Sequence, residues 1–197
     1  MKKIFTILTV VALTATISFA QTFGVKAGTS LASWYGADVD SDDKVLKPGM
    51  AIGAFAQFGD DTKRLTSELL FIQKGVKYAA DGDYMSYNMN YLEANTMGNF
   101  FVSDNISLNA GIYLGLHLGS SITVKIDGDK DSESIDSDDD DTRPMDFGSN
   151  FGLTFWLNDA MSIDARYGLG ILSLDEDGDF EASNSTIQIS FGYAFGN

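Results

Sequence analysis

The sequence has no cysteine, only two prolines and a single histidine in 197 residues. Without cysteine, disulfide bonds and thiolate metal sites are excluded. Pro48 and Pro144 each stand where an extended segment begins, a position that proline tolerates in a sheet. The rarity of proline therefore leaves long stretches of the chain free to form strands.

Long apolar runs are missing beyond the first twenty residues, so no later segment approaches the roughly eighteen apolar residues of a spanning helix. At the start, two lysines precede an apolar run from Ile4 to Phe19, and small residues precede Gln21. This pattern is typical of a secretory signal peptide over residues 1–20. We expect residues 21–197 to form one exported domain, and Gln21 in place of cysteine excludes a lipoprotein.

Basic residues are scarce. Without the two lysines of the signal peptide, 11 lysines and arginines face 28 acidic residues, a formal charge of −17. Such a chain repels nucleic acid and anionic surfaces at long range, so no nucleic-acid partner is expected.

The segment Ile106–Leu118, ISLNAGIYLGLHL, alternates without interruption. Its even positions are apolar, and its odd positions are small or polar, with Tyr113 and His117 among them. Since successive side chains on a strand point to opposite faces, this is a strand with one apolar face. Thirteen residues exceed the usual five or six of a soluble strand and suffice to cross a bilayer. The alternation predicts a membrane strand with its apolar face toward lipid.

Seven other segments have strand character, so we predict an all-β, eight-stranded, antiparallel up-and-down transmembrane barrel. The connections alternate between short periplasmic turns and long outer loops, which places both termini on the periplasmic side. The predicted strands are Thr22–Ala32, Pro48–Gly59, Arg64–Lys77, Tyr87–Phe101, Ile106–Gly119, Met145–Leu157, Met161–Ser173 and Asn184–Phe195.

The acidic residues follow this alternation. The four long connections, Ser33–Lys47, Tyr78–Ser86, Ser120–Pro144 and Leu174–Ser183, contain 20 of the 28 acidic residues. A soluble sandwich has no reason to gather its acids on alternate connections. We therefore expect acidic outer loops on one side of the membrane.

Ionisable residues also fall inside predicted strands, where facing lipid would be costly. We expect them to point into the lumen as a structural network of paired charges: Lys26, Glu68, Lys74, Glu93, His117, Asp164 and Arg166. A proton or ion path is the alternative role for this network. Eight strands enclose an interior just wide enough for side chains, and Phe55, Tyr113 and Trp156 are assigned to it. No channel of useful size is expected.

His117 raises the alternative of a membrane-embedded lipid-modifying hydrolase. Ser120 and Ser121 are close in sequence, but no nucleophile motif surrounds them. The alternation also points His117 toward the lumen, away from a lipid substrate. We therefore expect no catalytic residues and no enzyme activity.

One acidic segment resembles the start of a calcium-binding loop. Asp127, Asp129 and Asp131 take its positions 1, 3 and 5, but Ser132 and Asp138 stand where an EF-hand has Gly and Glu. We expect weak Ca²⁺ or Mg²⁺ binding without fixed geometry by Asp127, Asp129, Asp131, Glu133 and Asp138, and no other cofactor. The segment Asp127–Asp141 is so acidic that we expect it to be mobile.

Seven motifs occur in order along the chain: FGVKAG (23–28), KPG (47–49), ELLFIQKG (68–75), NYLE (90–93), NAGIYLG (109–115), DARYGLG (164–170) and IQISFGYAF (187–195). Together they resemble the outer-membrane β-barrel family typical of Bacteroidota, the group that includes PorT-like proteins. The resemblance implies an outer-membrane barrel of this size, usually without an assigned activity. The role of PorT-like proteins in secretion does not follow from membership of the broad family.

The favoured function is that of a non-enzymatic integral outer-membrane protein, with a structural role or a surface-interaction role for its acidic loops. Outer-membrane lipid, divalent cations and extracellular proteins are the expected partners, and a monomer is the expected state. The hydrolase is one alternative. A soluble secreted barrel that binds a small apolar ligand is another, and it would place its apolar face inward.

Overall fold

The computed structural model describes residues 22–60, 62–135, 142–175 and 180–195, so the predicted signal peptide lies outside the described residues. The described chain forms ten strands: β1 (Thr22–Tyr35), β2 (Lys44–Val45), β3 (Lys47–Gly59), β4 (Lys63–Ala80), β5 (Asp83–Ser103), β6 (Ile106–Ile126), β7 (Asp129–Ser134), β8 (Met145–Trp156), β9 (Met161–Gly170) and β10 (Ser183–Phe195). None of the described residues forms a helix long and apolar enough to span a membrane.

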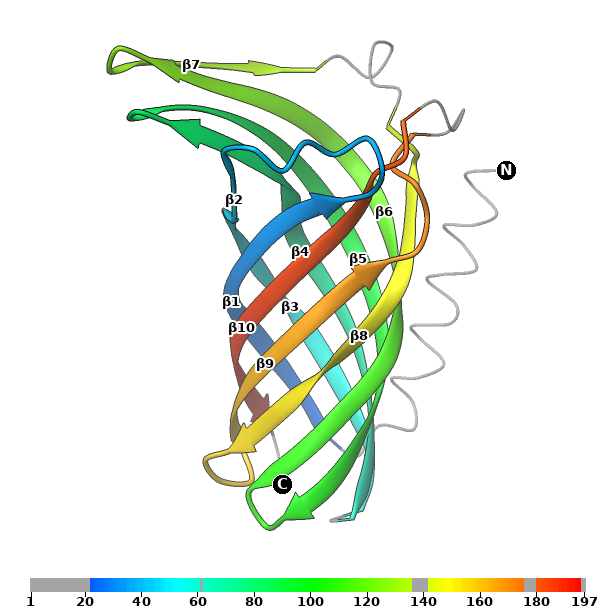
Figure 1. The fold of residues 1–197 in the computed structure, drawn as a ribbon. Coiled ribbons are helices and arrows are strands. Elements are labelled where there is room, and N and C mark those ends of the chain that lie inside the picture. The colour runs from blue at the N-terminus through cyan, green and yellow to red at the C-terminus, as the bar shows by residue number, and fades with distance from the viewer. Residues whose placement is uncertain (1–21, 61, 136–141, 176–179, 196–197) are drawn as a thin grey trace.

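Eight of these strands close into a ring, which confirms the predicted barrel (Figure 1). The order around the ring is β1, β3, β4, β5, β6, β8, β9 and β10, and β10 pairs with β1 again. Every neighbouring pair is antiparallel. Because the ring closes, none of its eight strands leaves a free edge within the membrane-spanning part.

The barrel has an apolar outer face and a polar inner face. On β6, Leu108 and Ile112 are 52% and 54% exposed, whereas Asn109 and Tyr113, the residues that follow them, are buried. The same alternation runs along β8, β9 and β10. A soluble barrel with an apolar ligand cavity would show the reverse arrangement, so that alternative is wrong.

The two ends of the barrel differ. At one end, called here the short-turn end, β3–β4, β5–β6 and β8–β9 are joined by short turns, and the last strand, β10, ends there (Figure 1). At the other end, the long-loop end, the outer parts of β4, β5 and β6 extend beyond the ring together with β7 (Figure 1).

Two of the four predicted long loops are instead made largely of strand. The connection predicted over Tyr78–Ser86 is a tight hairpin, because Asp81 and Gly82 both have positive φ, 54° and 96°. The pair Asp127–Gly128 repeats this geometry at the tip of β6 and β7. Asp-Gly with positive φ at both positions is the favoured two-residue hairpin turn.

The expectation that Asp127–Asp141 is mobile is wrong for its first part. Asp129–Ser134 forms β7 and pairs with Ser121–Ile126 of β6. Main-chain hydrogen bonds to β6 order these residues even though they bury little apolar surface. Composition alone does not reveal this stabilisation by main-chain pairing. Residues 136–141 lie outside the described residues.

Candidate functional site

The lumen contains a first cluster of four charged residues near the short-turn end. Lys26 of β1 places its Nζ 2.6 Å from Glu68 Oε1 and 3.1 Å from Asp164 Oδ2. Arg166 of β9 donates to both carboxylates, with Nη2 2.8 Å from Glu68 Oε1 and 2.9 Å from Asp164 Oδ1. Thr154 adds a hydroxyl hydrogen bond to Asp164. We call these four charged residues the lower cluster; two cations there balance two carboxylates.

A second cluster lies closer to the long-loop end. Lys74 Nζ of β4 lies 2.6 Å from Glu93 Oε2 and 3.0 Å from Asp146 Oδ2. Tyr113 and Asn184 also donate to Asp146, at 3.2 Å and 3.0 Å from its Oδ2. These five residues, called here the upper cluster, come from five different strands. The cluster therefore ties together strands far apart in the sequence.

Asp146 is the functional residue that sequence reasoning missed. It lies within the predicted strand Met145–Leu157, at the start of β8, but it is not among the residues predicted for the luminal network. The signal was nevertheless present, because Phe147 and Phe151 face outward and the positions of opposite parity must face inward. Asp146 is 2% exposed.

The charges in both clusters are almost entirely removed from solvent. Side-chain exposure is 0% for Glu68 and 1% for Lys74. A buried ion pair gains little net stability over apolar residues of the same size, but losing one partner leaves an uncompensated charge. Removing one charged partner from either cluster would therefore leave a buried charge uncompensated. The cavity beside the lower cluster is about 10 Å³ and holds at most about one water.

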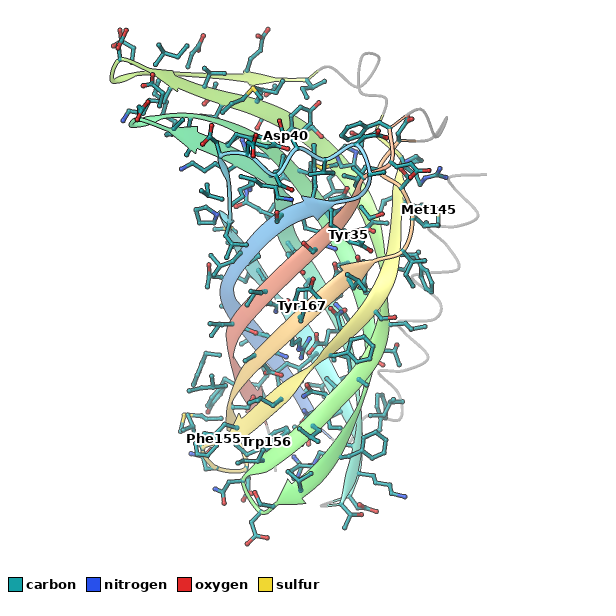
Figure 2. The ribbon with its side chains drawn as sticks, in the orientation of Figure 1. Tyr35, Asp40, Met145, Phe155, Trp156 and Tyr167 are labelled. Carbon is teal, nitrogen blue, oxygen red and sulfur yellow. The ribbon has the colours of Figure 1, made fainter. Side chains whose placement is uncertain are left out.

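Aromatic residues cover the lower cluster at the short-turn end. Trp156 stacks on Phe101 with ring centroids 5.6 Å apart, and the Arg64 guanidinium lies 4.8 Å and 5.1 Å from the two rings. Trp156 also donates its indole N–H to Ser107. Figure 2 shows Phe155 and Trp156 together at this end of β8, and Phe155 is 41% exposed whereas Trp156 is buried.

An apolar group covers the upper cluster at the long-loop end. Leu174 and Ala182, from the connection between β9 and β10, pack with Tyr91 in one buried cluster, and Trp34 and Tyr87 pack against it. The connections at this end thus fold into the mouth of the barrel.

His117 lies beside Tyr91, whose hydroxyl accepts a hydrogen bond from Asn184 and whose ring lies 5.3 Å from the Lys74 ammonium of the upper cluster. Its ring centroid is 5.3 Å from that of Tyr91, which is fully buried, and its Nε2 is 2.9 Å from Ser120 Oγ. Ser120 faces inward because of a β-bulge: Asn90 pairs with Gly119 and Tyr91 with His117, so Leu118 is an extra residue. The pair has the geometry of a nucleophile and a base, but both residues face the mouth of the lumen.

The residues predicted to bind divalent cations lie on the hairpin outside the ring. Asp129, Asp131 and Glu133 of β7 stand opposite Ile126, Val124 and Ile122 of β6 on one face of the sheet. Asp127 is in the turn, and Asp138 lies outside the described residues. Within the described residues, no three metal-ligating side chains gather at one point. Weak, diffuse cation binding stays a prediction.

A hollow of about 410 Å³ lies beside this hairpin. It is lined by Ile122 and Val124 of β6 and by the segment from Asp131 to Ile135. Apolar side chains and carboxylates therefore border the same space at the long-loop end.

Solved structures of other barrels share this architecture. Ail, the attachment invasion locus protein of Yersinia pestis, is 15% identical with a TM-score of 0.53, over 88% of this chain and 98% of that one. It has also been solved with the heparin analogue sucrose octasulfate. Neisserial surface protein A is 13% identical with a TM-score of 0.53, over 88% of this chain and 97% of that one. At these identities the likeness shows the fold alone.

The sequence comparisons assign the chain to a family. No curated protein matches it. The family model of the outer membrane protein beta-barrel domain matches residues 5–195, nearly the whole chain. Together with the closed ring and its apolar outer face, this match shows that the chain belongs to the outer membrane protein beta-barrel domain family.

Proposed function

We propose that this outer-membrane barrel is non-enzymatic and non-conducting. We also propose that its outer sheet, formed by β7 and the parts of β5 and β6 beyond the ring, is a contact surface for cationic partners. The filled lumen is the observation that supports the first part. Two clusters of ion-paired side chains occupy the lumen, aromatic side chains cover it at the short-turn end, and an apolar group covers it at the long-loop end. We further propose that the protein is a monomer from the Bacteroidota branch of its family, exported with cleavage before Gln21.

The outer sheet supports the second part of the proposal. Its apolar residues Met85 and Ile126 are 48% and 58% exposed to water, although they lie outside the membrane-spanning ring. Exposed apolar surface of this kind marks interaction sites. Asp131 and Glu133 border it, so the complementary partner is cationic as well as apolar.

The negative charge of these two carboxylates disfavours a ligand like the one with which Ail has been solved. Sucrose octasulfate carries many negative charges, and carboxylates beside the hollow would repel it. We therefore propose a basic amphipathic peptide or protein segment as the partner, with divalent cations as weak competitors.

Binding of a synthetic peptide of alternating leucine and lysine tests the proposal. The double variant Asp131→Asn/Glu133→Gln should bind it at least about fivefold more weakly than the wild type, and added salt should weaken wild-type binding. Asp40→Asn/Asp42→Asn removes the same charge from the β1–β2 connection and should change binding little. Equal binding by all three proteins would overturn the proposed surface. Millimolar Ca²⁺ should compete with the peptide only in proteins that keep Asp131 and Glu133.

One observation favours the hydrolase as a second candidate, namely the 2.9 Å contact between His117 Nε2 and Ser120 Oγ. A serine hydrolase also needs a group that orients the histidine and a path for the substrate. Hydrolysis of p-nitrophenyl esters and of phospholipid in micelles, compared between the wild type and Ser120→Ala, separates the candidates. We expect no difference between the two proteins; activity that disappears with Ser120 would establish the enzyme.

A further inference from the structure

A second hollow, of about 370 Å³, lies on the outer wall of the barrel at the short-turn end. It spans β3, β4 and β5, where Phe58 is paired with Leu65 and Leu65 with Gly98. Phe100 and Lys63 form the next pair on the same outer face. It is a shallow, largely open depression on the wall and not an enclosed pocket.

The hollow exists because Gly98 has no side chain. A Cβ at this position would have the Phe100 ring as its nearest contact, at 3.4 Å and 3.6 Å, an ordinary van der Waals distance. The nearest main-chain atom to such a Cβ would be the Ala110 carbonyl oxygen at 3.8 Å, also an ordinary contact distance. The space above Gly98 is therefore open to whatever surrounds the barrel.

The surroundings at this level are lipid. Leu65 and Phe100 are 45% and 54% exposed and belong to the apolar outer face, whereas Thr66 and Asn99 beside them in sequence are buried in the lumen. Phenylalanines at the end of the apolar face are typical of the membrane interface of such barrels. The hollow thus opens into the boundary between acyl chains and headgroups.

Lys63 gives this boundary a positive charge. Among the residues that the structure describes, the other basic side chains lie in the lumen or at the long-loop end, except Arg64, whose guanidinium lies over the rings of Phe101 and Trp156. The nearby Asp60 carboxylate accepts hydrogen bonds from Thr62 N, Thr62 Oγ1 and Lys63 N, and its charge also interacts with the charge of Lys63. Lysine at a membrane interface keeps its stem on apolar surface and its ammonium in the headgroup layer.

We propose that this hollow is a binding site for one anionic glycerophospholipid of the leaflet at the short-turn end. Its phosphate binds the Lys63 ammonium, and one acyl chain lies over Leu65 and Gly98 between Phe58 and Phe100. The charge-assisted hydrogen bond to phosphate and the apolar hollow act on the two ends of the same ligand. The site goes beyond the proposed outer contact surface and is independent of it.

Native mass spectrometry of the refolded protein in detergent, titrated with phosphatidylglycerol, tests the site. The wild type should retain one phosphatidylglycerol under activation that removes all other lipid, and phosphatidylcholine should bind more weakly. Lys63→Gln should weaken phosphatidylglycerol binding about tenfold, because it removes a charge-assisted hydrogen bond. Lys63→Arg should restore it. Inorganic phosphate, which has no acyl chain, should not displace the lipid.

Gly98→Leu tests the apolar half of the site, because its side chain would fill the hollow. This variant should lose both phosphatidylglycerol and phosphatidylcholine. Ala165→Leu, on β9 across the ring, and Lys130→Gln, on the outer hairpin, are the matched controls and should bind as the wild type does. Migration with and without boiling shows that each variant is folded. Retention of the single lipid by folded Lys63→Gln or by folded Gly98→Leu would overturn the site.

Discussion

Glu68 shows most directly how single residues hold this barrel together. Glu68 belongs to β4, and its carboxylate forms ion pairs with Lys26 of β1 and Arg166 of β9. Arg166 keeps its charge in this buried site, since arginine is not deprotonated in proteins. The carboxylate is thus the counter-charge on which two buried cations depend.

Glu68→Gln should destabilise the folded barrel by about 3–5 kcal/mol, because it breaks a buried pair and leaves the cations with Asp164 alone. Urea unfolding in lipid vesicles, followed by tryptophan fluorescence, measures the change. Glu133→Gln makes the same chemical change on the exposed strand β7 and should shift the free energy of unfolding by less than about 0.5 kcal/mol. Similar shifts in both variants would mean that the buried cluster does not stabilise the fold.

Asp60, in the turn between β3 and β4, gives a residue-scale prediction that depends on pH. Its side-chain hydrogen bond from Thr62, followed by the backbone N–H groups of Thr62 and Lys63, lowers the pKa of the carboxyl from 3.8 to about 2. Because the folded pKa lies below the unfolded one, Asp60 contributes stability above pH 4, and this is lost as the pH falls toward 2. Carboxyl NMR in micelles should give a pKa near 2 for Asp60 and a higher value in Thr62→Val. A wild-type pKa near 3.8 would show that the turn does not hold the carboxylate.

At the scale of elements, β6 combines two structures in one strand. From Ile106 to Leu118 it is a membrane strand, and the sequence alternation predicts its faces correctly. After the bulge at Leu118 the parity changes, so that Ser120 and Ile122 point toward the barrel axis. The outer half then pairs with β5 on one side and with β7 on the other.

Removing the outer hairpin tests whether the ring depends on it. Deletion of Asp127–Asp141 alone would leave the end of β6 far from Thr142, which bridges to Asp175 near the ring. Deletion of residues 123–137 removes both arms and leaves the β6–β8 pairing from Ile106–Phe155 to Leu116–Met145 intact. This variant should still migrate faster unboiled than boiled, with an unchanged urea midpoint. Loss of the fast-migrating band would show that the extension is required for folding.

The sequence predicts those parts of the fold that depend on alternation alone. Period two identified the outward face of β6 and the eight strands of the ring. It did not identify Asp146, because the partner of a strand-end residue depends on the register of β8 against β4 and β5 across the lumen. It also did not show that Arg64 and Phe101 meet Trp156, since these side chains come from three strands whose ends converge only in the closed ring.

At the scale of the whole molecule, the barrel is filled along its length. From the short-turn end toward the other, the lumen contains the Trp156 stack, the lower cluster, the upper cluster and the apolar group around Tyr91. Each layer consists of side chains from several strands. A continuous water path would require several layers to open at once.

Planar-bilayer recordings of the purified protein should therefore show no steady conductance steps, in bilayers where a sixteen-stranded porin conducts. Trp156→Ala should stay closed as well, because the lower cluster remains behind the removed ring and its adjoining cavity is only about 10 Å³. Protein that has been boiled before reconstitution is the control for leaks caused by unfolded chain. Regular steps from the folded wild type would mean that the charged clusters separate in the membrane, and the paired residues would then be candidates for an ion path.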